Sequence, residues 1–142
     1  MIYSKKVRDA LLICFNAHKE DYDKAGYPYV FHPFFLASQM DDEDTTIVAL
    51  LHDVIEDHGD QYDLNYFIKK GMGEKVCQAL DLLTHKKDVP YMDYIIKIKE
   101  DPIARKVKIA DLKHNIDIQR LEGKPHPKLK LYQEALAYLE GE

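Results

Sequence analysis

The sequence predicts an all-helical protein of about eight helices. Along most of the chain, apolar residues recur at intervals of three and four, as on the buried face of an amphipathic helix. No stretch shows the strict alternation of a half-buried strand, and short runs rich in glycine, proline or acidic residues separate the periodic segments. With 142 residues, 46% of them hydrophobic, the chain can bury a core, and we expect one domain spanning residues 1–142.

Composition narrows the range of functions. The net charge of −5 argues against a general nucleic-acid binder, which usually shows a basic surface. No apolar run approaches the roughly 18 residues of a membrane span, and the first residues are typical of an amphipathic helix rather than a signal peptide. Cys14 and Cys77 lie on apolar helical faces without a C-x-x-C pattern, so we expect reduced core cysteines. Together these features predict a cytoplasmic protein.

The first half of the chain predicts helices at residues 4–20, 32–40, 45–58 and 63–70. Ser4 is a suitable N-cap for the first helix, whose apolar stripe includes Phe15. Pro33 suits the first position of the second helix, and Asp63 and Gly71 mark the two ends of the fourth.

The second half predicts helices at residues 74–84, 102 to about 120 and 128–140, with another that opens at Pro90. Pro102 begins the long helix, whose apolar stripe runs from Ile103 to Ile118. Asp111 falls inside that stripe, where an apolar residue is expected.

Helix 45–58 changes character halfway along. It is strongly apolar as far as Leu51, and then His52, Asp53, Glu56 and Asp57 follow within six residues. An adjacent histidine and aspartate on a buried helix are costly to desolvate, and a bound metal is one compensation. Glu56 and Asp57 lie one turn further on, where they can act as general acid or base or orient the metal ligands.

Two other predicted helices also place a polar group on an apolar face, at His32 and Asp111. With His52 and Asp53 these residues form a nitrogen and oxygen ligand set that suits Mn²⁺, Fe²⁺ or Zn²⁺. A metal there would lower the pKa of a water molecule and supply hydroxide near neutral pH. Spacing alone does not bring these residues together, because His32 could be a satisfied core histidine and Asp111 could pair with a lysine.

Three ordered motifs resemble the HD superfamily of metal-dependent phosphohydrolases, whose signature is H…HD…D on an all-helical fold. They are most similar to the hydrolase domain of the RelA/SpoT guanosine-polyphosphate enzymes and their small stand-alone relatives, over about residues 10–120. The motifs are Ala17-His18 with Gly26, Pro28-Tyr29 and His32-Pro33; the run A-L-L-H-D-V-I-E-D at residues 49–57; and Lys108-Ile109-Ala110-Asp111 with His114-Asn115.

The resemblance implies an HD-domain helical bundle with a Mn²⁺ ion held by His32, His52, Asp53 and Asp111. It also implies that Glu56 and Asp57 activate or orient the attacking water, because hydrolysing members keep this pair. Substrate contacts are implied for the residues that match the family's substrate-binding positions, namely Lys24, Lys108 and Asn115.

One position departs from the family pattern. The family's base-stacking arginine, which precedes the lysine of the first loop, is Asp23 here. A carboxylate offers no planar cationic stack and repels phosphate, so this residue leaves the identity of the nucleotide open. Tyr91 and Tyr94 could offer aromatic faces to a base or could pack in the core. His58, His85 and His126 match no family role, and we expect them at the surface.

We therefore expect a Mn²⁺-dependent phosphohydrolase whose partner is a small-molecule nucleotide. Its reaction would resemble hydrolysis of the 3′-pyrophosphate of guanosine 3′,5′-bis(diphosphate). Two alternatives stay open: a phosphatase of another nucleotide such as NADPH, and a metal- and nucleotide-binding sensor without turnover. The intact pair Glu56-Asp57 favours an enzyme, and we expect neither nucleic acid nor membrane as a partner.

Overall fold

The all-helical prediction is confirmed by a computed structural model, which describes residues 2–117 and 119–141. Within these residues, the one extended pairing is an isolated bridge between Tyr22 and Pro28. The helices of the described part are α1 (Lys5–His18), α2 (Phe31–Ser38), α3 (Glu43–Leu51), α4 (Val54–His58), α5 (Leu64–Lys70), α6 (Glu74–Leu83), α7 (Tyr91–Lys99), α8 (Pro102–Asn115) and α9 (Leu129–Glu140).

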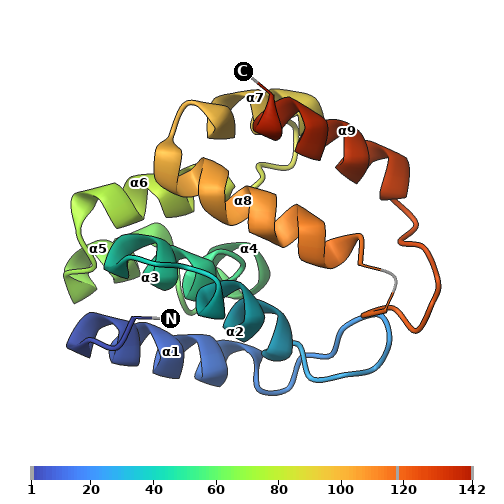
Figure 1. The fold of residues 1–142 in the computed structure, drawn as a ribbon. Coiled ribbons are helices and arrows are strands. Elements are labelled where there is room, and N and C mark those ends of the chain that lie inside the picture. Colours follow the sequence, from blue (N-terminus) through green and yellow to red (C-terminus); the bar gives the residue numbers. More distant parts are fainter. Residues whose placement is uncertain (1, 118, 142) are drawn as a thin grey trace.

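Helix α3 forms the centre of the fold. It packs against α1, α2, α6 and α8, and every residue from Thr45 to Leu51 is buried. A helix that is apolar on all sides is typical of such an enclosed position. In Figure 1, α1 lies on the outer side of α2 and α3, and α8 crosses on their other side, below α7 and α9. The site is therefore built where the enclosed helix meets α2 and α8.

The predicted helix 45–58 is two helices rather than one. α3 ends at Leu51 and α4 begins at Val54, so His52 and Asp53 occupy the junction between them. On a continuous helix, neighbouring side chains point about 100° apart. At this junction Nε2 of His52 instead lies 3.1 Å from Oδ2 of Asp53. The break lets two adjacent side chains face the same point.

Most helix ends follow the predicted signals. The side chains of Ser4, Asp63 and Asp101 accept hydrogen bonds from the first-turn N–H groups of α1, α5 and α8. Gly71 ends α5 in the left-handed conformation, at φ +80°, as a stop residue should. α8 ends at Asn115 rather than near residue 120, and Ile118 lies outside the described residues.

The buried core contains Cys14 and Cys77, which are both free, as predicted. Phe15 was expected on the buried stripe of α1, but 45% of its surface is exposed. Within the described residues, none of the helices combines the length and the hydrophobicity that crossing a bilayer requires.

Candidate active site

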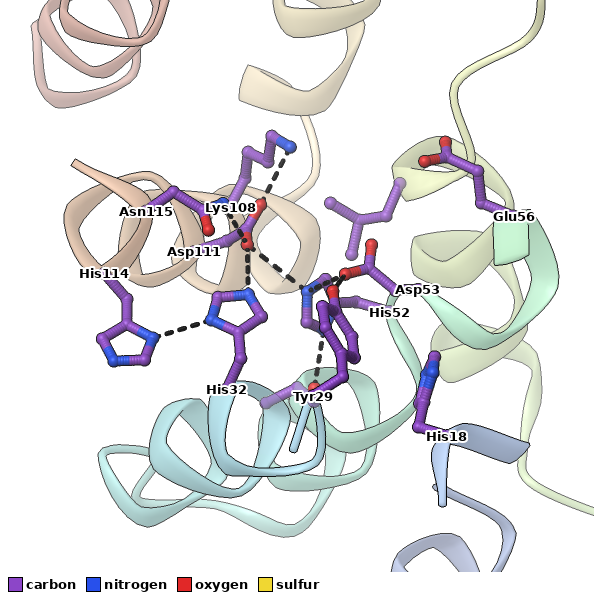
Figure 2. A network of polar contacts seen from close by, with 12 residues as sticks. His18, Tyr29, His32, His52, Asp53, Glu56, Lys108, Asp111, His114 and Asn115 are labelled. Atoms are coloured by element: carbon purple, nitrogen blue, oxygen red, sulfur yellow. Dashed lines mark hydrogen bonds and ion pairs between the residues drawn. The ribbon is translucent and has the colours of Figure 1, made fainter. Parts of the chain in front are cut away.

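Four predicted ligand residues from three parts of the chain converge at one point (Figure 2). His32 comes from the first turn of α2, His52 and Asp53 from the α3–α4 junction, and Asp111 from the third turn of α8. One nitrogen or oxygen atom from each side chain lies within 4.8 Å of all the others. Three of the four residues are buried, and Asp53 is half-buried. The fold thus assembles the H…HD…D set.

His52 shows why this cluster requires a cation. Its Nδ1 lies 2.7 Å from the carbonyl oxygen of Ala49, and a carbonyl can only accept, so Nδ1 carries the hydrogen. In a neutral ring, Nε2 is then a lone pair that faces Asp53 Oδ2 at 3.1 Å and Asp111 Oδ1 at 3.4 Å. Three lone-pair donors that face one another repel unless a proton or a metal ion lies among them.

The charges of the cluster lead to the same conclusion. Burial lowers the pKa of His52, but the two carboxylates outweigh burial and hold this pKa well above its usual value. Burial raises the pKa of Asp53 and of Asp111, and nearby cations reverse both shifts, chiefly His52 for the first and Lys108 for the second. Without a metal, a proton on His52 therefore supplies the positive charge. A divalent ion would fit the same donor set.

His32 is oriented from both sides. Its Nε2 lies 2.7 Å from Oδ1 of Asp111, and its Nδ1 lies 2.7 Å from Nδ1 of His114. The His32 and His114 rings are parallel within 1°, and the Phe35 ring stacks on His114 with 4.3 Å between ring centres. If Nε2 of His32 binds a metal, Nδ1 must carry the hydrogen and donate it to His114. Burial and the neighbouring His32 and Arg120 lower the pKa of His114 to about 4, so His114 is neutral and can accept.

Asp111 accepts hydrogen bonds from two neighbours on its own helix. Lys108 Nζ lies 2.9 Å from Oδ2, and Asn115 Nδ2 lies 3.0 Å from Oδ1. The Lys108 ammonium also lies 5.3 Å from the centre of the Tyr94 ring. In this arrangement Lys108 holds the carboxylate in place, and its predicted contact with substrate stays a prediction. Asn115 extends the network, because its Oδ1 accepts a hydrogen bond of 2.7 Å from Arg120.

Tyr29 completes the surroundings of Asp53. Its hydroxyl donates a short hydrogen bond to Oδ2 of Asp53, and its ring lies beside those of His18 and His32. Burial and the Asp53 charge raise the pKa of Tyr29 well above its usual value, so the phenol keeps its proton. Asp53 therefore has a fixed donor on one side.

A cavity of about 350 Å³ opens onto the cluster, and Asp53, Asp111, Glu56, Asp57 and Asn115 lie in its wall. Glu56 lies at the far side of Asp53 (Figure 2), and its Oε1 accepts a hydrogen bond of 2.8 Å from the backbone of His85. Loss of hydration and the charges of Asp53 and Glu56 raise the pKa of Asp57 to about 7. A carboxyl group with this pKa can exchange protons at neutral pH.

A second cavity of about 250 Å³ adjoins the first, since Tyr29 and Asn115 line both. Lys24 and Arg120 bring positive charge to this second cavity. Asp23 also lines it, but its Oδ1 accepts the backbone N–H groups of Ala25 at 2.9 Å and Tyr27 at 3.0 Å. The residue that departs from the family pattern therefore holds the loop in shape.

The two tyrosines with open roles differ in position. Tyr94 is buried and donates to the carbonyl of Leu83 at 2.7 Å, so it belongs to the core. Tyr91 is half-buried, and both tyrosines line the first cavity. His126 was expected at the surface but is buried, and its ring lies 4.8 Å from that of Tyr132.

Sequence reasoning assigned no role to Tyr29, His114 or Arg120. Tyr29 and His114 belong to the matched motifs, and His114 lies one turn from Asp111 on the same helix, which could have indicated its place beside His32. Arg120 lies beyond the end of α8, where helical spacing gives no direction for its side chain.

Comparison with known proteins agrees with the geometry. The bifunctional (p)ppGpp synthase/hydrolase SpoT of Escherichia coli K12 is 33% identical over 124 residues, which cover 79% of this chain and 18% of that protein. The guanosine-3′,5′-bis(diphosphate) 3′-pyrophosphohydrolase of Aquifex aeolicus is 28% identical over 126 residues, which cover 80% of this chain and 18% of that protein. The chain thus spans about a fifth of the length of these curated relatives.

A solved structure of a metazoan ortholog of SpoT, described as hydrolysing ppGpp, has the same fold. Its TM-score is 0.77 at 21% identity, and the match covers 99% of this chain and 89% of that one. No protein-family model matches the sequence. The motifs, the fold and the matched relatives lead to one conclusion: the chain is a relative of the HD-type hydrolase domains of the RelA/SpoT enzymes.

Proposed function

We propose that this protein is a divalent-metal-dependent nucleotide hydrolase that removes the 3′-pyrophosphate of guanosine 3′,5′-bis(diphosphate). One observation carries the proposal: Nε2 of His52 faces two buried or half-buried carboxylates, an arrangement that needs a proton or a metal ion among them. The names of the relatives from Escherichia coli and Aquifex aeolicus support the choice of substrate.

The ion would be held by His32, His52, Asp53 and Asp111. These nitrogen and oxygen donors suit Mn²⁺. The proposed ligand set contains no thiolate, the donor that would favour a softer metal. A divalent ion in this position polarises phosphate oxygens and makes a water molecule acidic near neutral pH. Tyr29 and His114 keep the donor atoms in place, because one donates to Asp53 and the other hydrogen-bonds to His32.

Asp57 is the residue that we assign to proton transfer. It lies in the same cavity wall as Asp53 and Asp111, and its pKa of about 7 allows it to accept a proton from the attacking water and return it to the leaving group. Glu56 shares this wall, and the backbone hydrogen bond from His85 fixes its carboxylate beside Asp57. The negative charge of Glu56 helps to keep the pKa of Asp57 high.

The two adjoining cavities suit a nucleotide that carries phosphates at both ends of its ribose. The first cavity would hold the scissile pyrophosphate beside Asn115. Lys24 and Arg120 in the second cavity would bind the remaining phosphates, and Arg can do so with two parallel hydrogen bonds.

The test is a turnover assay on a panel of nucleotides with Mn²⁺, in which the products are identified by chromatography and mass spectrometry. We expect guanosine 3′,5′-bis(diphosphate) to give guanosine 5′-diphosphate and pyrophosphate, with activity lost on chelation. Release of phosphate from NADPH instead would show a different nucleotide phosphatase. Binding without turnover of any nucleotide would contradict the enzyme and favour the sensor.

A further inference from the structure

A second group of metal-ligating side chains lies outside the proposed active site. His18 in the last turn of α1, Asp21 in the following loop and His58 at the end of α4 each offer one ligand atom, and these atoms lie within 4.8 Å of one another. We call this group the His18–Asp21–His58 cluster. We propose that it is a second divalent-metal site, which takes Zn²⁺ or a similar ion.

The geometry brings all three residues to one oxygen atom. Oδ2 of Asp21 lies 2.9 Å from Nδ1 of His18 and 2.6 Å from Nε2 of His58. In the active-site cluster, the corresponding nitrogen-to-oxygen distances run from 2.7 to 3.4 Å. A tetrahedral Zn²⁺ ion about 2.0–2.2 Å from each donor would hold these atoms about 3.4 Å apart, so they would separate by roughly 0.5–0.8 Å when the ion binds. The contact between His32 and Asp111 in the active-site cluster is similarly short, at 2.7 Å.

The surroundings leave an open side for a fourth ligand. The His18 side chain is fully buried, but 34% of Asp21 and 26% of His58 is exposed. Both exposed residues line a cavity of about 520 Å³, to which Glu20 and Asp60 add carboxylates. Two histidines and one carboxylate with room for water are a common zinc ligand set. Lys19 also lines this cavity, but its three carboxylates, with Asp21 included, outnumber that one lysine and favour a cation over an anion.

Such an ion would join three segments that shape the active site. The His18 ring packs on Tyr29 at 4.8 Å between ring centres, and Tyr29 donates to Asp53. His58 directly follows Asp57 on α4. A metal bound here would hold the ends of α1 and α4 together. It would restrain Tyr29 and Asp57 without touching the substrate.

The test measures metal content after the purified full-length protein is loaded with Zn²⁺ and desalted. We expect about two equivalents in the wild type and about one in His58→Ala and in Asp21→Asn. The double variant His52→Ala/Asp111→Asn has lost two ligands of the active-site cluster. It should also retain about one equivalent, bound at the His18–Asp21–His58 cluster. As a control, His126→Ala removes a histidine outside both clusters and should keep two.

Co²⁺ provides a second readout. Tetrahedral or five-coordinate Co²⁺ absorbs visible light, so the active-site double variant should still show a cobalt spectrum that disappears when His58→Ala is added. The proposal is overturned if His58→Ala and Asp21→Asn keep the wild-type metal content, or if the double variant binds no metal while circular dichroism shows it folded. Neither result would touch the proposed nucleotide hydrolysis, which depends on the first cluster.

Discussion

At the scale of single residues, the site is organised by which nitrogen or oxygen atom holds a proton. The hydrogen bond to Ala49 fixes the tautomer of His52. If a metal binds Nε2 of His32, the hydrogen of that ring lies on Nδ1 and is donated to His114, so both rings would present a lone pair to the ion. Asp57 stands apart, because loss of hydration and then the charges of Asp53 and Glu56 raise its pKa to about 7.

Replacing Asp57 by asparagine should lower kcat by about 10²- to 10⁴-fold, because the amide cannot accept the proton of the attacking water. Metal content should stay at the wild-type level, since Asp57 is not among the proposed ligands. Steady-state kinetics with elemental analysis measures both. Asp93→Asn, an exposed position on α7, is the matched control. A kcat within about twofold of wild type in Asp57→Asn would remove Asp57 from the mechanism.

His114 predicts how stability depends on pH. Its pKa falls from 6.5 in the unfolded chain to about 4 in the fold, so the unfolded state binds more protons between these values. The contribution of His114 to the free energy of unfolding is fully present above pH 6.5 and is lost as the pH falls toward 4. Urea unfolding of the metal-free proteins at pH 7 and pH 5 measures how much free energy of unfolding is lost between these pH values. This loss should be smaller by about 1 kcal/mol in His114→Gln than in the wild type. An equal loss in both proteins would show that His114 does not titrate in this way.

Arg120 is expected to act on substrate binding rather than on the chemical step. Arg120→Gln should raise KM for guanosine 3′,5′-bis(diphosphate) by about tenfold, with kcat changed by less than about twofold. Lys124→Gln, which removes an exposed charge from a different cavity, serves as the control. A lower kcat at unchanged KM would contradict this role. It would show instead that Arg120 contacts the reacting phosphate or orients Asn115.

At the scale of elements, the decisive feature is the break between α3 and α4. Helical spacing is continuous through residues 45–58, and for that reason it predicted one helix. The structure instead ends α3 at Leu51 and begins α4 at Val54, and at this junction Nε2 of His52 lies 3.1 Å from Oδ2 of Asp53. The periodicity of apolar residues does not show where a helix is interrupted.

The start of α3 offers a direct test of how the helix that precedes His52 is held. Asp42 Oδ1 accepts the backbone N–H of Thr45 at 2.8 Å and the hydroxyl of the same residue at 2.8 Å. Asp42→Ala should lower the free energy of unfolding by about 1 kcal/mol, whereas Asp42→Asn, which keeps a capping oxygen, should lose less than half of that. Chemical denaturation measures the difference, and equal losses in the two variants would show that the cap contributes little.

At the scale of the whole molecule, the sequence predicted the helical class, the caps at Ser4 and Asp63, and the four residues of the central cluster. The meeting of His32, His52 and Asp111 came from the family resemblance, since spacing does not relate positions so far apart. What could not be predicted depends on tertiary contacts. Arg120 reaches Asn115 from a turn after α8, and His58 meets His18 across two helices that the sequence separates by some 40 residues.

The central claim is that one metal centre built by α2, α8 and the α3–α4 junction hydrolyses the nucleotide. The measurement that tests it most directly is Mn²⁺-dependent release of pyrophosphate from guanosine 3′,5′-bis(diphosphate) by the wild type and by Asp53→Ala, with circular dichroism to confirm that both are folded. Because Asp53→Ala removes a proposed metal ligand, we expect kcat/KM to fall by about 10³-fold or more in this variant. Wild-type kcat/KM in folded Asp53→Ala would contradict it.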